Sequence, residues 1–160
     1  EIMPALQSGV IDATEWVGPW NDLAFGFYKI AKYYYGPGFH EPNSALECLI
    51  NLEAYNALPK DLQAIVKYAC KAENAGMVSE FTAANSASQT VLVDQHNVQI
   101  RHFPDDVVKT AFSIADEVVA ETADFDGLAK KIYENWSHFR AEAMTRGPYA
   151  EQGYMNNRAL

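Results

Sequence analysis

Basic residues are scarce in this sequence of 160 residues. It has no run of lysines or arginines, and its formal net charge is −9 at pH 7. A surface this acidic repels the phosphates of nucleic acids and disfavours docking to anionic lipids. No stretch approaches the roughly 18 consecutive apolar residues that a membrane-spanning helix needs. The composition therefore argues against a nucleic-acid partner and against direct insertion into a membrane.

Recognisable catalytic motifs are also missing. The sequence has no Gly-x-Ser-x-Gly elbow, no glycine-rich phosphate loop, no His-Glu-x-x-His and no cluster of cysteine and histidine. The histidines are scattered, and none has a second ligand at metal-binding spacing. We interpret each of them as a surface or structural residue: His40, His96, His102 and His138.

Cysteine is rare, with Cys48 in a predicted strand and Cys70 in a predicted helix. The two form no metal motif, and their spacing leaves a disulfide open. We favour two buried thiols that pack as small hydrophobic groups.

Glycine and proline divide the first 58 residues into short predicted elements. These are a helix over residues 4–8, a strand over residues 10–17, two helical pieces within residues 20–30 separated at Gly26, an aromatic strand over residues 33–35 and an alternating strand over residues 44–52. The three tyrosines could form a stacking platform for bases or sugars. On an acidic chain, an interior strand with its rings packed between layers is the better interpretation.

Long helices are predicted after Pro59. We expect one helix over residues 61–94, or two with a break near Gly76, and further helices over residues 104–122 and 125–145, with a short strand over residues 98–102 between them. Helices with three or four short strands are typical of an α/β fold. So few strands make a poor independent sheet, and the opening residues, which show no signal peptide, read as the middle of a domain.

We therefore expect the chain to be a fragment of a larger protein, with a loose tail after residue 146.

Two glutamates occupy positions where packing alone does not favour a charge. Glu15 lies inside the apolar run of residues 11–17, where an inward-facing carboxylate is costly unless it is paired. Glu41 follows Gly-Pro-Gly-Phe-His, whose turn formers restrict the backbone. Each alone is more often a solvated edge residue. Together they suit a hard cation such as Na⁺ or Ca²⁺, with Trp16 as a rigid apolar wall.

Two longer motifs make the sequence recognisable. Residues 5–19, Ala-Leu-Gln-Ser-Gly-Val-Ile-Asp-Ala-Thr-Glu-Trp-Val-Gly-Pro, closely resemble a signature of the solute-binding proteins of TRAP (tripartite ATP-independent periplasmic) transporters. Residues 33–42, Tyr-Tyr-Tyr-Gly-Pro-Gly-Phe-His-Glu-Pro, resemble a second signature, from the DctP-like branch that binds α-keto and related carboxylic acids. Residues 58–63 and 98–104 match the same family, and the resemblance extends to about Arg140.

This resemblance implies the helix-rich C-terminal part of a two-lobed, flytrap-like (type II-like) periplasmic-binding-protein fold, with an α/β architecture of few short strands and long helices. In that fold, residues 1–18 would form a strand and crossover near the ligand cleft, and residues 19–58 a cleft loop and core strands. Residues 59–146 would supply long packing helices, and residues 147–160 a loose tail. The resemblance implies a periplasmic receptor that captures a small 2-oxo or 2-hydroxy carboxylate and delivers it to the TRAP membrane permease. Such a receptor is not an enzyme.

The resemblance also implies a metal site, because a sodium or calcium ion bridges protein and substrate carboxylate in this branch. Glu15 and Glu41 would then be side-chain ligands of the metal. Trp16 would supply a backbone carbonyl to the metal and a wall to the substrate pocket. Trp20 and Phe39 would line the same pocket.

Other family features fall outside these motifs. The arginine that pairs with the substrate and a glutamine metal ligand belong upstream of Glu1, and Arg101, Arg140, Arg146 and Arg158 lie in no motif that would replace them. Relatives form homodimers through a C-terminal helix, so residues 125–145 and the tail are the expected interface.

Two other classes of protein remain as alternatives. A metal-dependent lyase or hydrolase would use Glu15 or Glu41 as a base, although no second catalytic group converges on them in the sequence. A helical interaction module would present exposed apolar stripes on the helices of residues 61–94 and 104–145.

Overall fold

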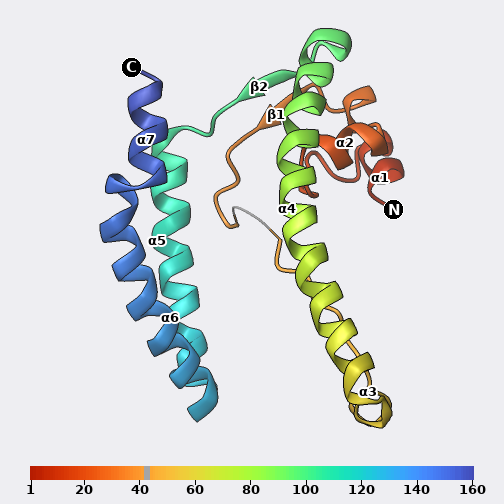
Figure 1. The fold of residues 1–160 in the computed structure, drawn as a ribbon. Coiled ribbons are helices and arrows are strands. Elements are labelled where there is room, and N and C mark those ends of the chain that lie inside the picture. The colour runs from red at the N-terminus through yellow and green to blue at the C-terminus, as the bar shows by residue number, and fades with distance from the viewer. Residues whose placement is uncertain (42–43) are drawn as a thin grey trace. The chain divides into compact units, whose positions relative to one another are not determined.

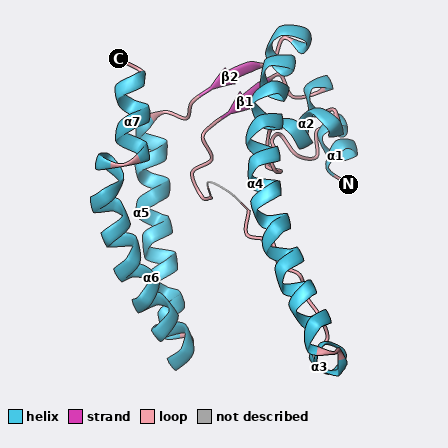
Figure 2. Ribbon diagram, viewed as in Figure 1, coloured by secondary structure: helices cyan, strands magenta, loops and turns pink. Residues whose placement is uncertain are grey.

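The computed structural model describes residues 1–41 and 44–160, which fall into two compact units, residues 1–103 and residues 104–160. Both units are built mainly of helices (Figures 1 and 2), as the sequence predicts. No helix within the described residues combines the length and the apolar character needed to cross a lipid bilayer.

The first unit begins with two short helices that end at glycines. Helix α1 (Ile2–Ser8) ends at Gly9 and α2 (Pro19–Phe25) ends at Gly26, and both glycines adopt the left-handed conformation, with φ of 71° and 78°. Glycine is favoured there because it has no Cβ to clash with the backbone. The 3₁₀ helix η1 (Phe27–Lys29) follows, so the predicted interruption at Gly26 is confirmed.

The strand predicted over residues 10–17 is wrong. The structure has a loop between α1 and α2, and residues 12–17 are exposed. A strand forms only where a partner satisfies its backbone N–H and C=O groups. Within the described residues no strand pairs with this segment, so its apolar composition does not produce one.

Two short strands do pair. Strands β1 (Tyr33–Tyr35) and β2 (Gln99–Arg101) are parallel, with Tyr34 opposite Ile100. The interior position expected for the tyrosines holds only in part, because Tyr33 and Tyr35 are exposed and Tyr34 is half-buried. The Arg101 guanidinium lies 3.7 Å from the centre of the Tyr33 ring, a cation–π contact.

The segment that leads from the loop after β1 to the next helix is also not a strand. Residues 44–51 have no regular structure and are exposed, where the sequence predicts a strand over residues 44–52. Helix α3 (Leu52–Ala57) begins directly after this segment. The Asn51 side chain caps it by accepting a hydrogen bond from the Ala54 N–H at 3.0 Å.

One long helix carries the rest of the first unit. Helix α4 (Lys60–His96) has 37 residues and continues through Gly76, so the break considered there does not occur. A glycine inside a helix costs only about 1 kcal/mol, which the surrounding hydrogen bonds easily outweigh. The helix ends at Asn97, whose positive φ of 56° lets the Asn97 N–H donate to the Val93 carbonyl and the Val98 N–H donate to the Leu92 carbonyl.

The core of the first unit lies where α2 packs on α4. Its buried apolar side chains are Leu6, Phe27, Leu92 and Val98. The rings of Trp20 and Phe81 meet edge to face at 5.0 Å, which joins α2 to the middle of α4.

The second unit consists of helices α5 (Asp105–Glu121), α6 (Gly127–Arg146) and α7 (Glu151–Arg158), with 3₁₀ helices η2 (Thr122–Asp124) and η3 (Gly147–Tyr149) between them. Arg140 on α6 forms an ion pair with Asp116 on α5 at 3.2 Å. Residues 147–160, which the sequence analysis treats as a loose tail, are mostly helical in the structure. None of the described residues 104–160 is buried.

The sequence analysis favours burial of both cysteines. This prediction is wrong, because Cys48 and Cys70 are both exposed. Cys48 lies in the irregular segment before α3, not in a strand, whereas Cys70 lies on α4 as predicted. The two thiols are neighbours in space.

Candidate metal-binding site

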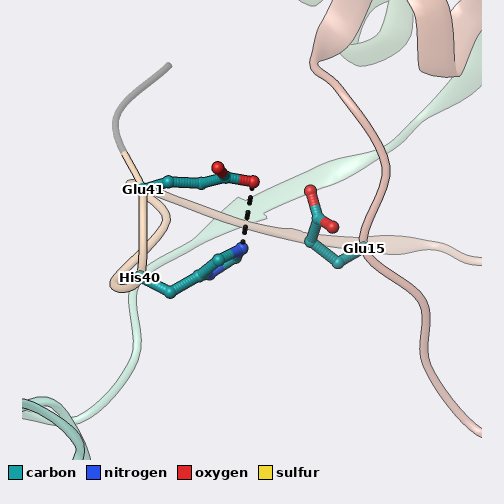
Figure 3. A group of neighbouring side chains, drawn as sticks. All are labelled: Glu15, His40 and Glu41. Carbon is teal, nitrogen blue, oxygen red and sulfur yellow. Dashed lines mark ion pairs between the residues drawn. The ribbon is translucent and has the colours of Figure 1, made fainter. Parts of the chain in front are cut away.

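Three side chains that could hold a metal ion gather in the first unit. Glu15, His40 and Glu41 each offer a ligand atom, and these atoms lie within 4.8 Å of one another (Figure 3). Glu15 comes from the loop between α1 and α2, and the other two from the loop after β1. All three side chains are exposed. The structure thus brings together the two glutamates that the sequence singled out, 26 residues apart.

The loop that carries Glu15 is held at its end by α4. The Asn85 side chain accepts a hydrogen bond from the Trp20 N–H at 3.0 Å. Gly18 passes so close to Asn85 that a Cβ at this position would lie 3.1 Å from the Asn85 Oδ1. A glycine before Pro19 therefore allows the loop to approach α4, and α2 begins directly after it.

The loop that carries Glu41 begins at the sheet. The Gly36 N–H donates to the Arg101 carbonyl at 3.0 Å, which extends the pairing of β1 with β2 by one bond. The chain then turns back on itself, and a Cβ at Gly38 would lie 3.3 Å from the Glu41 carbonyl oxygen. The turn formers thus hold Glu41 in a tight loop, as the sequence predicts. Pro42, which the sequence places at the end of this loop, lies outside the described residues.

The charges at this cluster are unbalanced. The His40 Nε2 lies 3.5 Å from the Glu41 Oε1, an ion pair only when the imidazole is protonated. Within the part of the chain that the structure describes, no lysine or arginine pairs with either glutamate. Two carboxylates at this separation repel each other, and a cation between them would remove the repulsion. Oxygen donors of this kind suit a hard cation such as calcium.

A buried carboxylate lies near Glu15 of this cluster. Asp22 on α2 is only 8% exposed, and its Oδ2 accepts a hydrogen bond of 2.6 Å from the Tyr34 hydroxyl on β1. Burial raises the pKa of Asp22, while the Tyr34 hydrogen bond lowers it. Burial, and then the hydrogen bond to Asp22, raise the pKa of Tyr34. This pair joins α2, which follows the Glu15 loop, to β1, which precedes the Glu41 loop.

Sequence reasoning missed two residues of this region. In the sequence His40 reads as a surface or structural residue, because no second ligand lies at short spacing from it, whereas its neighbours in space include Glu15, from 25 positions earlier. The sequence signal that could have identified His40 is its position directly before Glu41. Asp22 reads in the sequence as an ordinary first-turn acid. Its burial depends on Tyr34, which no local pattern reveals.

The aromatic residues expected at a pocket differ in their surroundings. The Trp16 and Phe39 rings are each 42% exposed. Trp16 meets Phe25 edge to face at 5.2 Å, and Phe39 meets His40 at the same distance. The Trp20 ring packs on Phe81 of α4. The inward orientation expected for Glu15 is wrong, because the side chain is exposed.

Comparison with known proteins gives a consistent result. The family model of bacterial extracellular solute-binding proteins, family 7 (DctP), matches residues 1–125. A monocarboxylate 2-oxoacid-binding periplasmic protein of Nostoc sp. is 36% identical over 156 residues, which cover 98% of this chain and 43% of the relative.

A solved structure is similar over nearly the whole chain. It is a TRAP transporter solute-binding protein from Bordetella bronchiseptica, 30% identical, with a TM-score of 0.92 over 98% of this chain and 46% of that protein. That structure is a mixed-occupancy dimer with copurified calcium and picolinate in one active site and an apo second site. The chain thus spans about half the length of the relatives that it matches.

Proposed function

Because the chain belongs to family 7 of the bacterial extracellular solute-binding proteins, the DctP family, we propose that it is part of a receptor that captures a small 2-oxo or 2-hydroxy carboxylate. Like its relatives, the protein is periplasmic, and its family is one of binding proteins, not of enzymes. The observation that carries the proposal is the convergence of Glu15, His40 and Glu41.

Glu15 and Glu41 are the proposed side-chain ligands of a metal ion, with the Trp16 carbonyl as a third ligand. Their donor chemistry fits the ion, because carboxylate and carbonyl oxygens are what calcium and sodium take from proteins. The copurified calcium of the Bordetella relative favours calcium over sodium. When bound, the ion supplies positive charge that attracts the carboxylate of the substrate.

His40 is better suited to positioning than to coordination. Hard cations prefer oxygen to nitrogen, and the His40 Nε2 already lies 3.5 Å from the Glu41 Oε1. A protonated or Nε2–H imidazole at this place would hold Glu41 in one orientation. We therefore expect His40 to affect the affinity for the ion less than either glutamate does.

The apolar part of the substrate would contact Trp16 and Phe39, the two partly exposed rings beside these residues. Trp20 was expected to line the pocket as well. Its packing on Phe81 favours a supporting role, in which it fixes the end of the Glu15 loop on α4. The filled receptor would then deliver the acid to a TRAP membrane permease, as the class of the solved relative suggests.

The test is a binding measurement on the full-length protein after metal is removed with a chelator. Calcium, then a 2-oxo or 2-hydroxy acid such as pyruvate or lactate, is titrated in a calorimeter, with sodium in place of calcium as a parallel series. Glu15→Gln or Glu41→Gln removes one charge and is expected to weaken calcium binding on the order of 10- to 100-fold. The matched control is Glu53→Gln, at an exposed glutamate on α3 outside the cluster.

Three results would contradict the proposal. One is that no acid of this class binds with either ion present. Another is that both glutamine variants bind calcium as tightly as the wild type and the control. Turnover of the added acid, detected by nuclear magnetic resonance, would favour a metal-dependent enzyme instead.

A further inference from the structure

The segment between the Glu41 loop and α3 has little to hold it in place. Within the described residues, no backbone hydrogen bond involves residues 44–50. Apolar side chains here, such as Leu46 and Leu49, are more than three-quarters exposed. Yet this segment directly follows the loop that carries Glu41, so its position matters for the site.

The corner between α3 and α4 brings this segment back along α4. The Gln63 side chain donates to the Leu58 carbonyl at 2.9 Å, and the Tyr55 hydroxyl donates to the Gln63 carbonyl at 3.3 Å. Cys48 precedes this corner and Cys70 follows it on α4, and their thiols neighbour each other.

We propose that Cys48 and Cys70 form a disulfide in the periplasm that fastens residues 44–51 to α4. Both sulfurs are exposed and adjacent, and the protein resides in a compartment where paired cysteines are oxidised. The inference does not depend on the proposed ligand or metal.

The oxidant is a protein or small-molecule disulfide. The thiolate of one cysteine attacks it, which forms a mixed disulfide and releases one thiolate of the oxidant. The second cysteine, after losing its proton, attacks the mixed disulfide and expels the other thiolate. The chain loses two protons and two electrons, and the oxidant becomes a dithiol or two thiols.

The bond would connect both halves of the proposed metal site to one helix. Asn85 of α4 already holds the end of the Glu15 loop through the Trp20 N–H. Cys70 lies on the same helix and would hold the segment that follows Glu41. Helix α4 would then fix the spacing between the two loops.

The experiment uses full-length protein exported to the periplasm and purified without reductant. Free thiols are alkylated under denaturing conditions, and the digest is analysed by mass spectrometry. The expected result is a cross-linked peptide pair that contains Cys48 and Cys70 and is two hydrogens lighter than the separate peptides. Recovery of both cysteines alkylated, or joined to any other cysteine, overturns the proposal.

A second measurement tests whether the bond fastens the segment. Reduction of the wild type is expected to lower its thermal midpoint by roughly 3–10 °C, because the bond closes a loop of 22 to 23 residues in the unfolded chain. The variant with both Cys48→Ser and Cys70→Ser is the control, and reductant should leave its midpoint unchanged. An equal response of the two proteins to reductant would overturn the structural role.

Discussion

At the scale of single residues, Asp22 is the most unusual group in the first unit. It is a carboxylate that burial removes from water, and the Tyr34 hydroxyl donates to its Oδ2. Burial raises its pKa above the ordinary value of 3.8. The folded state therefore holds the proton of Asp22 more tightly than the unfolded state does.

The sign of the resulting pH dependence follows from this shift. The contribution of Asp22 to stability is fully present below pH 3.8 and is lost as the pH rises through its folded pKa. Asp22→Asn cannot titrate and keeps an oxygen that accepts from Tyr34. We expect the variant to gain stability relative to the wild type as the pH rises from 3 to 7, measured by urea unfolding across that range.

Tyr34→Phe is the matched control for this prediction, with the opposite sign. It removes the donor from a buried carboxylate and should lower the free energy of unfolding at pH 7 by about 1–3 kcal/mol. If Asp22→Asn followed the same pH curve as the wild type, the carboxylate would not titrate in the way its burial indicates.

The sequence identifies the two glutamates of the site but not the residues that surround them. Glu15 and Glu41 could be identified because each interrupts a pattern, and turn formers place Glu41 in a tight loop. His40 and Asp22 could not, because their neighbours in space are Glu15 and Tyr34, 25 and 12 positions away. Side-chain contacts over such separations leave no local periodicity.

At the scale of secondary-structure elements, helices are predicted well and strands poorly. Proline and glycine mark the ends of α1 and α2, and a helix forms its backbone hydrogen bonds within its own segment. The segments of residues 10–17 and 44–52 have strand-like composition, but a strand needs hydrogen bonds from another segment. In the described chain only β1 and β2 find such a partner.

The glycines within helices provide a prediction at this scale. A Cβ at Gly76 in α4 would meet no atom within 4 Å. Gly76→Ala should therefore raise the free energy of unfolding by about 0.5–1 kcal/mol, because alanine loses less backbone entropy in a helix. Chemical denaturation of the full-length protein measures the change.

Gly153 in α7 is the contrasting position. A Cβ there would collide with the backbone carbonyl of Pro148, which cannot move aside as a flexible side chain could. Gly153→Ala should destabilise the protein despite its better helix propensity. Equal effects of the two substitutions would show that helix propensity alone, and not the space around each glycine, governs them.

At the scale of the whole molecule, the second unit has more apolar surface than a solvated helical hairpin needs. On α6, Leu128, Ile132, Trp136 and Phe139 recur at intervals of four, four and three residues, and each is more than 40% exposed. Such spacing places them on one face of the helix. Exposed apolar faces of this kind commonly mark protein interfaces.

We propose that this face takes part in a homodimer, since the Bordetella relative is a dimer. Phe139→Asp places a charge on the face and should convert full-length dimers to monomers, as measured by light scattering during size-exclusion chromatography. Val10→Asp, at an exposed apolar position in the first unit, is the control. A wild type that is monomeric at all concentrations, or a dimer unaffected by Phe139→Asp, would contradict this proposal.

The position of Trp16 has an optical consequence. Its indole ring is partly exposed and directly follows Glu15 in the chain. Terbium takes the oxygen ligands that calcium takes, and its emission is weak unless a nearby aromatic ring absorbs light and transfers the energy. A lanthanide between Glu15 and Glu41 would have such an antenna at hand, so occupancy of the site could be followed by luminescence without a label.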